Sequence, residues 1–142
     1  MKRIINTTLA LLLVLALTLS FAACGQKTAV DELWQEATYL TDTTLGNGEK
    51  TLSLEVCAGE KTVKFTVKTD KNTVGDALLE NKLIEGEDSQ YGLYIKKVNG
   101  ITADYDIDQS YWAFYINGEY ATSGVDTTDI DQTAVYKLEY AK

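Results

Sequence analysis

The stretch that decides the predicted fold runs Tyr111-Trp112-Ala113-Phe114-Tyr115-Ile116-Asn117-Gly118-Glu119-Tyr120. An Asn-Gly pair between β-forming residues is among the strongest short-range signals for a tight hairpin turn. Because successive side chains of a strand point to opposite faces, Trp112, Phe114 and Ile116 share one face and the residues between them share the other. Both faces are largely apolar. We therefore expect one face to meet the core and the other to be covered by another segment or offered to a partner.

Three further stretches carry the period-two alternation of strands. Residues 51–68 alternate on both sides of the turn 58–61 and predict a second β-hairpin. Residues 92–98 predict a strand that ends at the turn Asn99-Gly100, and residues 134–140 predict the last strand.

A helix is predicted between the strands, beginning after Thr73 as N-cap with Asp76 at the third position. Its buried side would be Ala77, Leu78, Leu79 and Leu83, and Gly86 would mark its end. Residues 31–40 fit a helix or the start of a strand equally well. The order of elements predicts an α+β fold, in which one helix packs on a mostly antiparallel sheet.

Composition bounds the function of the 142 residues. There are 13 Lys plus Arg against 21 Asp plus Glu, for a net charge of −8, and this argues against nucleic-acid binding. The absence of histidine removes Ser-His-Asp and Cys-His catalytic pairs and imidazole zinc sites. We expect no enzyme, no cofactor and no metal site, although paired carboxylates remain a possible route to catalysis.

The first residues are predicted to be an export signal. Lys2 and Arg3 precede an apolar run over 9–19, which is too short to span a membrane comfortably. The ending Ser20-Phe21-Ala22-Ala23-Cys24-Gly25 resembles the lipobox of bacterial lipoproteins, although Phe21 stands where Leu is usual. That resemblance implies cleavage after residue 23 and lipidation of Cys24. The alternative is ordinary secretion with the same cleavage.

Three segments follow from this interpretation. Residues 1–23 are a lipoprotein signal peptide, residues 24–49 hold the lipidated cysteine, a tether and an N-terminal segment, and residues 50–142 are the folded domain. The lipid would hold the protein at the extracytoplasmic face of the cell membrane, since two or more acyl chains anchor stably. Cys57 is interpreted as a passive strand residue.

Several motifs together resemble the transcobalamin-like C-terminal domain, found in bacterial lipoproteins and in animal cobalamin carriers. These motifs are Thr73-Val74-Gly75-Asp76-Ala77-Leu78, Val98-Asn99-Gly100, the stretch 111–119, Gly124-Val125-Asp126 and Tyr136-Lys137-Leu138-Glu139-Tyr140. The resemblance covers about residues 50–142 and implies a soluble-ligand-binding β-grasp domain. In the carriers this domain caps cobalamin against a large helical domain, which residues 1–142 do not contain.

Aromatic residues are the candidate ligand-binding groups, because rings bury much area and keep a polar handle. The candidates are Tyr111, Trp112, Phe114, Tyr115 and Tyr120. Trp112 and Phe114 could equally be plain core. The ligand would be a small molecule, with cobalamin or a related cofactor implied by the resemblance. The alternative is a module that binds a surface protein or the cell wall through its tyrosines.

Two acidic runs are candidate cation sites. Asp104, Asp106 and Asp108 start like a calcium loop, but Gln109 stands where glycine is needed and Tyr115 where glutamate is needed. The second run is Asp126, Asp129 and Asp131. A solvated acidic surface is the preferred interpretation of both runs.

Overall fold

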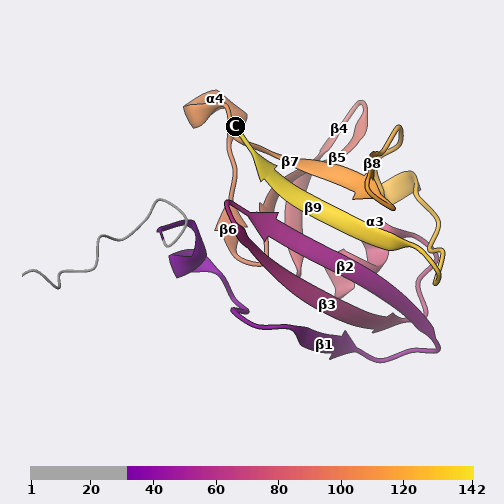
Figure 1. The fold of residues 1–142 in the computed structure, drawn as a ribbon. Coiled ribbons are helices and arrows are strands. Elements are labelled where there is room, and N and C mark those ends of the chain that lie inside the picture. The colour runs from indigo at the N-terminus through magenta and orange to yellow at the C-terminus, as the bar shows by residue number, and fades with distance from the viewer. Residues whose placement is uncertain (1–31) are drawn as a thin grey trace, which may run out of the picture.

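The structure is a computed structural model and describes residues 32–142 (Figure 1). The predicted signal peptide 1–23 and the predicted lipidation site Cys24 lie outside these residues. Among residues 32–142, no helix is long and apolar enough to cross a membrane.

A six-stranded sheet forms one layer of the fold (Figure 1). Its strands follow the order β1 (Thr43–Gly46), β3 (Lys61–Thr69), β2 (Lys50–Ala58), β9 (Val135–Ala141), β7 (Tyr111–Ile116) and β8 (Glu119–Tyr120). Both predicted hairpins are confirmed, as β2–β3 and β7–β8. The pairs β1–β3 and β2–β9 are parallel and the other pairs are antiparallel.

A second sheet has three strands, β4 (Ile84–Ser89), β5 (Gly92–Val98) and β6 (Ile101–Thr102). The helical elements are α3 (Val74–Glu80), the short α4 (Tyr105–Asp108), and two 3₁₀ turns, η2 (Trp34–Glu36) and η3 (Val125–Thr127). The α+β class is confirmed, but the prediction of a single sheet is wrong. Strand β4 was missed because only its first residue is buried, so its sequence lacks the alternation of a half-buried strand.

The prediction places the start of the helix correctly, but the observed helix ends earlier than predicted. The Thr73 hydroxyl accepts the Asp76 N–H at 3.2 Å, as an N-cap should. The helix stops at Glu80 because Asn81 turns its side-chain amide back onto the Ala77 carbonyl and Lys82 takes a left-handed φ of 54°. Leu79, which was predicted on the buried side of the helix, is exposed. Gly86 marks an irregularity in the pairing of β4 with β5 and not a helix end.

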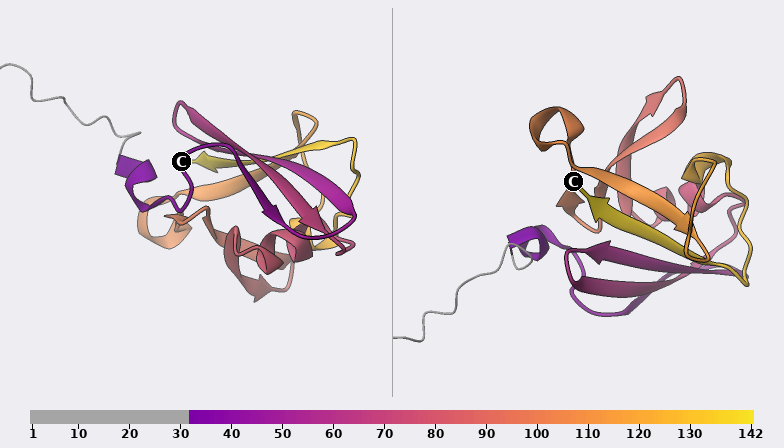
Figure 2. Two further views of the ribbon diagram at one scale, coloured as in Figure 1. Left: turned by 90° about the horizontal axis from the view of Figure 1, so that it is seen from below. Right: turned by 45° about the horizontal axis from the view of Figure 1, so that its top comes forward.

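The core lies between the six-stranded sheet and a layer formed by α3 and the three-stranded sheet (Figure 2). Alternating residues of β2 and β3 supply one side, and Leu52, Leu54 and Phe65 are fully buried there. Ala77 and Leu78 of α3 supply part of the other side. On the opposite face of the large sheet, β2 and β3 present mainly polar side chains, and Cys57 lies there beside the Thr62 hydroxyl.

Residues 32–49 share this core. Residues 31–40 form neither of the two predicted elements at full length, because only a helical turn and η2 appear there. Trp34 is buried, and its indole N–H donates to the Ala58 carbonyl at 2.9 Å. The buried Asn99 amide pairs with the Tyr39 backbone on both sides, at 2.9 Å and 2.8 Å. The N-terminal segment is thus attached to both sheets.

Candidate functional site

The candidate site is a groove of about 270 Å³ between β5 and β7. The loop that follows β8 and leads into η3 closes one end of it. We call it the aromatic groove, and its walls are Leu93, Tyr94, Ile95, Tyr111, Trp112, Phe114, Tyr120, Ala121, Ser123, Gly124 and Val125. None of these side chains carries a formal charge. The groove therefore suits a neutral or largely apolar group.

The wall that β7 supplies is rigid because its rings pack on β9. Phe114 stacks on Tyr136 with centroids 6.1 Å apart, and Trp112 meets Tyr140 edge to face at 5.6 Å. Both β7 residues are nearly buried and also belong to the core. They serve as core and as groove wall at once, so the two interpretations of these residues are compatible.

Four of the five predicted ligand-binding residues meet at the groove, namely Tyr111, Trp112, Phe114 and Tyr120. Tyr115 does not line it. The Lys137 ammonium lies 4.3 Å from the centre of its ring, and Tyr120 packs against it edge to face at 5.4 Å. The hydrogen bond from Lys137 to Glu139 raises the pKa of the lysine and keeps this ammonium charged. Tyr115 and Tyr120 are directly opposed in the β7–β8 pair, so their rings support each other across the strands.

Two polar atoms at or behind the groove are buried without a hydrogen-bond partner among residues 32–142. They are the Trp112 indole Nε1 and one carboxylate oxygen, Oδ1, of Asp126. A side-chain carbon at Gly124 would lie 2.6 Å from that oxygen, so the Asp126 carboxylate sits directly behind the groove wall. A buried polar atom without a partner costs about 1–3 kcal/mol. Such atoms are candidates for pairing with a ligand or with water.

The position of Asp126 depends on close backbone contacts. Gly75 of α3 faces η3, and a side-chain carbon there would lie 2.9 Å from the backbone of Asp126. The Val74 N–H also donates to the Thr128 carbonyl at 2.9 Å. Only glycine at position 75 lets η3 approach the helix this closely. The Thr73–Leu78 motif and the Gly124–Asp126 motif therefore meet in space and fix one end of the groove.

Sequence reasoning missed the wall that β5 supplies. Leu93, Tyr94 and Ile95 were predicted only as strand residues, and nothing in their spacing pairs them with β7. The Gly124-Val125 pair was noted as a motif but was not assigned to a binding site. Of the three β5 residues, Tyr94 is the aromatic one, and its ring is the only signal in this strand that could have suggested a binding site.

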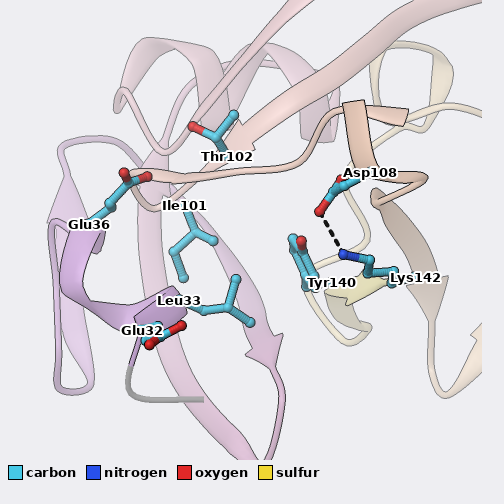
Figure 3. A pocket seen from close by; sticks show the side chains of 8 residues that line it. All are labelled: Glu32, Leu33, Glu36, Ile101, Thr102, Asp108, Tyr140 and Lys142. Carbon is cyan, nitrogen blue, oxygen red and sulfur yellow. Dashed lines mark hydrogen bonds and ion pairs between the residues drawn. The ribbon is translucent and has the colours of Figure 1, made fainter. Parts of the chain in front are cut away.

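A larger hollow of about 470 Å³ lies at the end of the molecule where η2, β6 and the C-terminus come together (Figure 3). Asp108 accepts from the Lys142 ammonium at 2.9 Å on one side, whereas Glu32 and Glu36 lie beyond Leu33 and Ile101 on the other (Figure 3). The Ser110 hydroxyl, and then Lys142, lower the pKa of Asp108 to about 2. These charges are paired or solvated. Among residues 32–142, no buried polar side-chain atom that lacks a hydrogen-bond partner belongs to a residue lining this hollow.

The two acidic runs do not combine. Asp104 accepts the Asp106 N–H at the start of α4, Asp108 binds Lys142, and Asp131 accepts from Thr133. In the part of the chain from 32 to 142, no three Cys, Asp or Glu side chains gather where they could hold a metal ion.

Comparison with known proteins gives a match to a family model and matches to several solved structures. Residues 71–136 match the family described as Domain of unknown function (DUF4430). That range runs from just before α3 into β9 and includes every residue of the aromatic groove. No curated protein matches the chain.

The first structure is that of a protein from Ruminococcus gnavus ATCC 29149 that has been proposed to bind metal. It is 29% identical with a TM-score of 0.62, and the match covers 66% of this chain and 98% of that one. The second is haptocorrin in complex with Cbi, which is 20% identical with a TM-score of 0.50. That match covers 69% of this chain and 27% of haptocorrin. The likeness to haptocorrin supports the transcobalamin-like fold that the sequence resemblance implied.

Proposed function

We propose that the protein binds a small ligand in the aromatic groove and does not act as an enzyme. The observation that carries the proposal is the coincidence of an aromatic-walled hollow with two buried, unpaired polar atoms, Trp112 Nε1 and Asp126 Oδ1. Binding sites for small molecules are concave, mostly apolar and equipped with a few placed polar groups. Both atoms are closed off from solvent, so a ligand would pair with them only after the groove rearranges.

The class of ligand follows from the walls. No wall residue carries a formal charge and several are rings, so the groove favours a flat or ring-bearing group with both a donor and an acceptor. A volume of about 270 Å³ is just below the 300–1,000 Å³ usual for whole-ligand pockets. We therefore propose that the groove takes one edge of a larger molecule. A corrinoid such as cobalamin is the first candidate, because haptocorrin was solved with Cbi.

The proposal includes membership of the soluble-ligand-binding β-grasp group and attachment to the membrane. The lipobox-like sequence ending at Cys24 supports a lipid anchor on the extracytoplasmic face. The full sequence has a net charge of −8, and cleavage after residue 23 would remove Lys2 and Arg3, so the anchored domain would be still more acidic and would stay away from anionic headgroups. A ligand-binding domain held in this way would collect its ligand next to the membrane.

Titration of purified residues 25–142 with cobinamide and with cobalamin tests the proposal, using the visible spectrum and heat. We expect a dissociation constant on the order of 0.1–1 mM, because the match covers only 27% of haptocorrin. Tyr120→Ala should weaken binding about fivefold or more without lowering stability, since Tyr120 is largely exposed. Tyr91→Ala is the matched control, because this exposed tyrosine lies outside the groove.

Two results would contradict the proposal in different ways. No change in spectrum or heat at several millimolar would remove corrinoids as ligands of this domain. Binding that is unchanged by Tyr120→Ala would show that the corrinoid binds away from the groove. Trp112 is unsuitable as a test residue, because truncating a core tryptophan costs about 3–5 kcal/mol of stability.

Metal binding, which has been proposed for the Ruminococcus gnavus protein, is not part of this proposal. Among residues 32–142, no three Cys, Asp or Glu side chains come together where they could hold a metal ion.

The second candidate function is an interaction module for a surface protein or the cell wall. It is favoured by Tyr91 and Ile107, which are 88% and 82% exposed. They lie on the β4–β5 hairpin and on α4, which both rise beyond the large sheet (Figure 2). A cell-wall pelleting assay would test this function. Sedimentation that is reduced by Tyr91→Ser with Ile107→Ser, and not by Tyr120→Ala, would favour the module over the groove.

A further inference from the structure

Three tyrosines and one aspartate line another hollow, of about 500 Å³, which is open to solvent and lies next to the aromatic groove. Tyr94 comes from β5, Tyr105 and Asp106 from α4, and Tyr111 from the start of β7. We call this hollow the tyrosine cage. Three separate elements build it, all within residues 94–111, and the turns between them bring their side chains together.

The three rings do not pack on one another. Within residues 32–142 the ring pairs in contact are Tyr39–Phe65, Trp112–Tyr140, Phe114–Tyr136 and Tyr115–Tyr120. Tyr94, Tyr105 and Tyr111 are 37%, 56% and 37% exposed. Three rings that line one hollow without filling it leave aromatic surface available to a guest. Grouped exposed aromatic residues commonly mark a binding site.

The charges around the cage are predominantly negative. The carboxylate of Asp106 forms no hydrogen bond or ion pair with any residue that the structure describes, while Asp104 is occupied as the cap of α4. The nearby cation is Lys96, whose ammonium lies 3.3 Å from Glu87. Glu87, together with Asp104 and Asp106, raises the pKa of Lys96. One lysine thus stands among three carboxylates, and Asp106 is the carboxylate that lines the cage.

We propose that the tyrosine cage binds an organic cation, specifically an alkylated ammonium group such as trimethylammonium. Cations are attracted to the electron-rich faces of aromatic rings, and cages of rings with an acid are a known way to hold quaternary ammonium. An inorganic cation requires several oxygen ligands, and one carboxylate does not supply them. An anion would be repelled by the local charge. An alkylated ammonium is only weakly hydrated and uses both the rings and Asp106.

The cage can be tested separately from the aromatic groove. Tyr105 and Asp106 line the cage and not the groove, whereas Phe114 and Tyr120 line the groove and not the cage. If corrinoid binding to the aromatic groove is disproved, the inference about the tyrosine cage is unaffected. If cation binding to the cage is disproved, the proposal for the groove is likewise unaffected. Tyr94 and Tyr111 belong to both hollows and are avoided as test residues.

The test is titration of residues 25–142 with choline, followed by nuclear magnetic resonance of the tyrosine rings. The neutral comparison is 3,3-dimethylbutan-1-ol, which has the shape of choline without its charge. We expect choline to bind with a dissociation constant on the order of 10 mM and the alcohol to bind at least about fivefold more weakly. Choline methyl protons should show direct magnetisation transfer to the ring of Tyr105.

Substitutions separate the contribution of the ring from that of the charge. Tyr105→Leu should weaken choline binding about two- to fivefold, whereas Tyr105→Phe should preserve it because it keeps the ring. Asp106→Asn should weaken binding about threefold, and less so at 1 M salt, where charges are screened within about 3 Å. Tyr91→Leu and Asp88→Asn are the matched exposed controls and should change nothing.

Each other outcome overturns the inference. Equal binding of choline and the alcohol would show an apolar hollow without cation recognition. Equal weakening by Tyr105→Leu and Tyr105→Phe would assign the contact to the hydroxyl and not to the ring. No change in ring signals at 100 mM choline would show that the cage binds no such cation. Should a variant lose its fold, the magnetisation transfer in the parent protein still decides the site.

Discussion

Replacing Asn99 by glycine should release the N-terminal segment from the three-stranded sheet. The Asn99 side chain is almost fully buried and makes two hydrogen bonds with the Tyr39 backbone, at 2.9 Å and 2.8 Å. Each such bond contributes about 1 kcal/mol net. Asn99 has a φ of 49°, which glycine adopts without strain, so backbone geometry is preserved. With the entropic cost of glycine, about 0.5–1 kcal/mol, we expect a loss of about 2.5–3 kcal/mol.

The chain supplies a matched control at Asn117. This residue has a φ of 50° and also precedes a glycine in a tight turn, but it is exposed and its side chain accepts one hydrogen bond, from Val135 N at 2.9 Å. Asn117→Gly should therefore cost about 1.5–2 kcal/mol. The difference of about 1 kcal/mol corresponds to roughly 4 °C in melting temperature at about 4 °C per kcal/mol. Urea unfolding followed by tryptophan fluorescence measures both variants.

A pH experiment gives a second measure of the same contact. Asn99→Asp would place a carboxylate against the Tyr39 carbonyl, where burial and repulsion raise the pKa of the introduced group. The protonated form can donate to that carbonyl, as the amide does. The destabilisation should therefore be small below about pH 4 and should grow as the pH rises through the raised pKa. Equal losses for the two glycine variants, or a pH-independent loss for Asn99→Asp, would refute the reasoning.

Three further predictions concern other parts of the molecule. The Ser110 and Lys142 hydrogen bonds hold the pKa of Asp108 at about 2, so its stabilising effect is present above about pH 4 and is lost as the pH falls through 2. The difference in melting temperature between the parent and Asp108→Asn should therefore shrink from pH 5 to pH 2, and a constant difference would argue against the shift. Thr73→Ala should lower the free energy of unfolding by about 0.5–2 kcal/mol in urea, because the Asp76 N–H loses its cap; no change would mean that solvent replaces this cap fully. Cys24→Ser in the full chain should leave an unprocessed precursor or release the protein from the detergent phase, and unchanged partition with unchanged mass would exclude lipidation.

Local sequence determined those elements whose signals lie within a few residues. The turns Asn99-Gly100 and Asn117-Gly118 adopt positive φ at all four positions, because asparagine and glycine tolerate that region best. The Thr73 cap and the alternation of residues 50–69 and 135–141 depend in the same way on neighbours along the chain. These signals were sufficient for the α+β class and for the aromatic character of the candidate site.

Tertiary structure decided everything that depends on contacts between distant segments. Strand β4 carries almost no apolar pattern and forms because β5 pairs with it. The Asn99 amide was read as a turn residue, yet it also holds Tyr39 at a separation of 60 residues. The aromatic groove arises because β5 packs beside β7, and this packing adds Tyr94 to the site. The pairing of β7 with β9 places Tyr115 beside Lys137 and outside the groove. Alternation along a strand tells which side chains share a face, but only the packing of the sheets decides which face becomes a cavity wall.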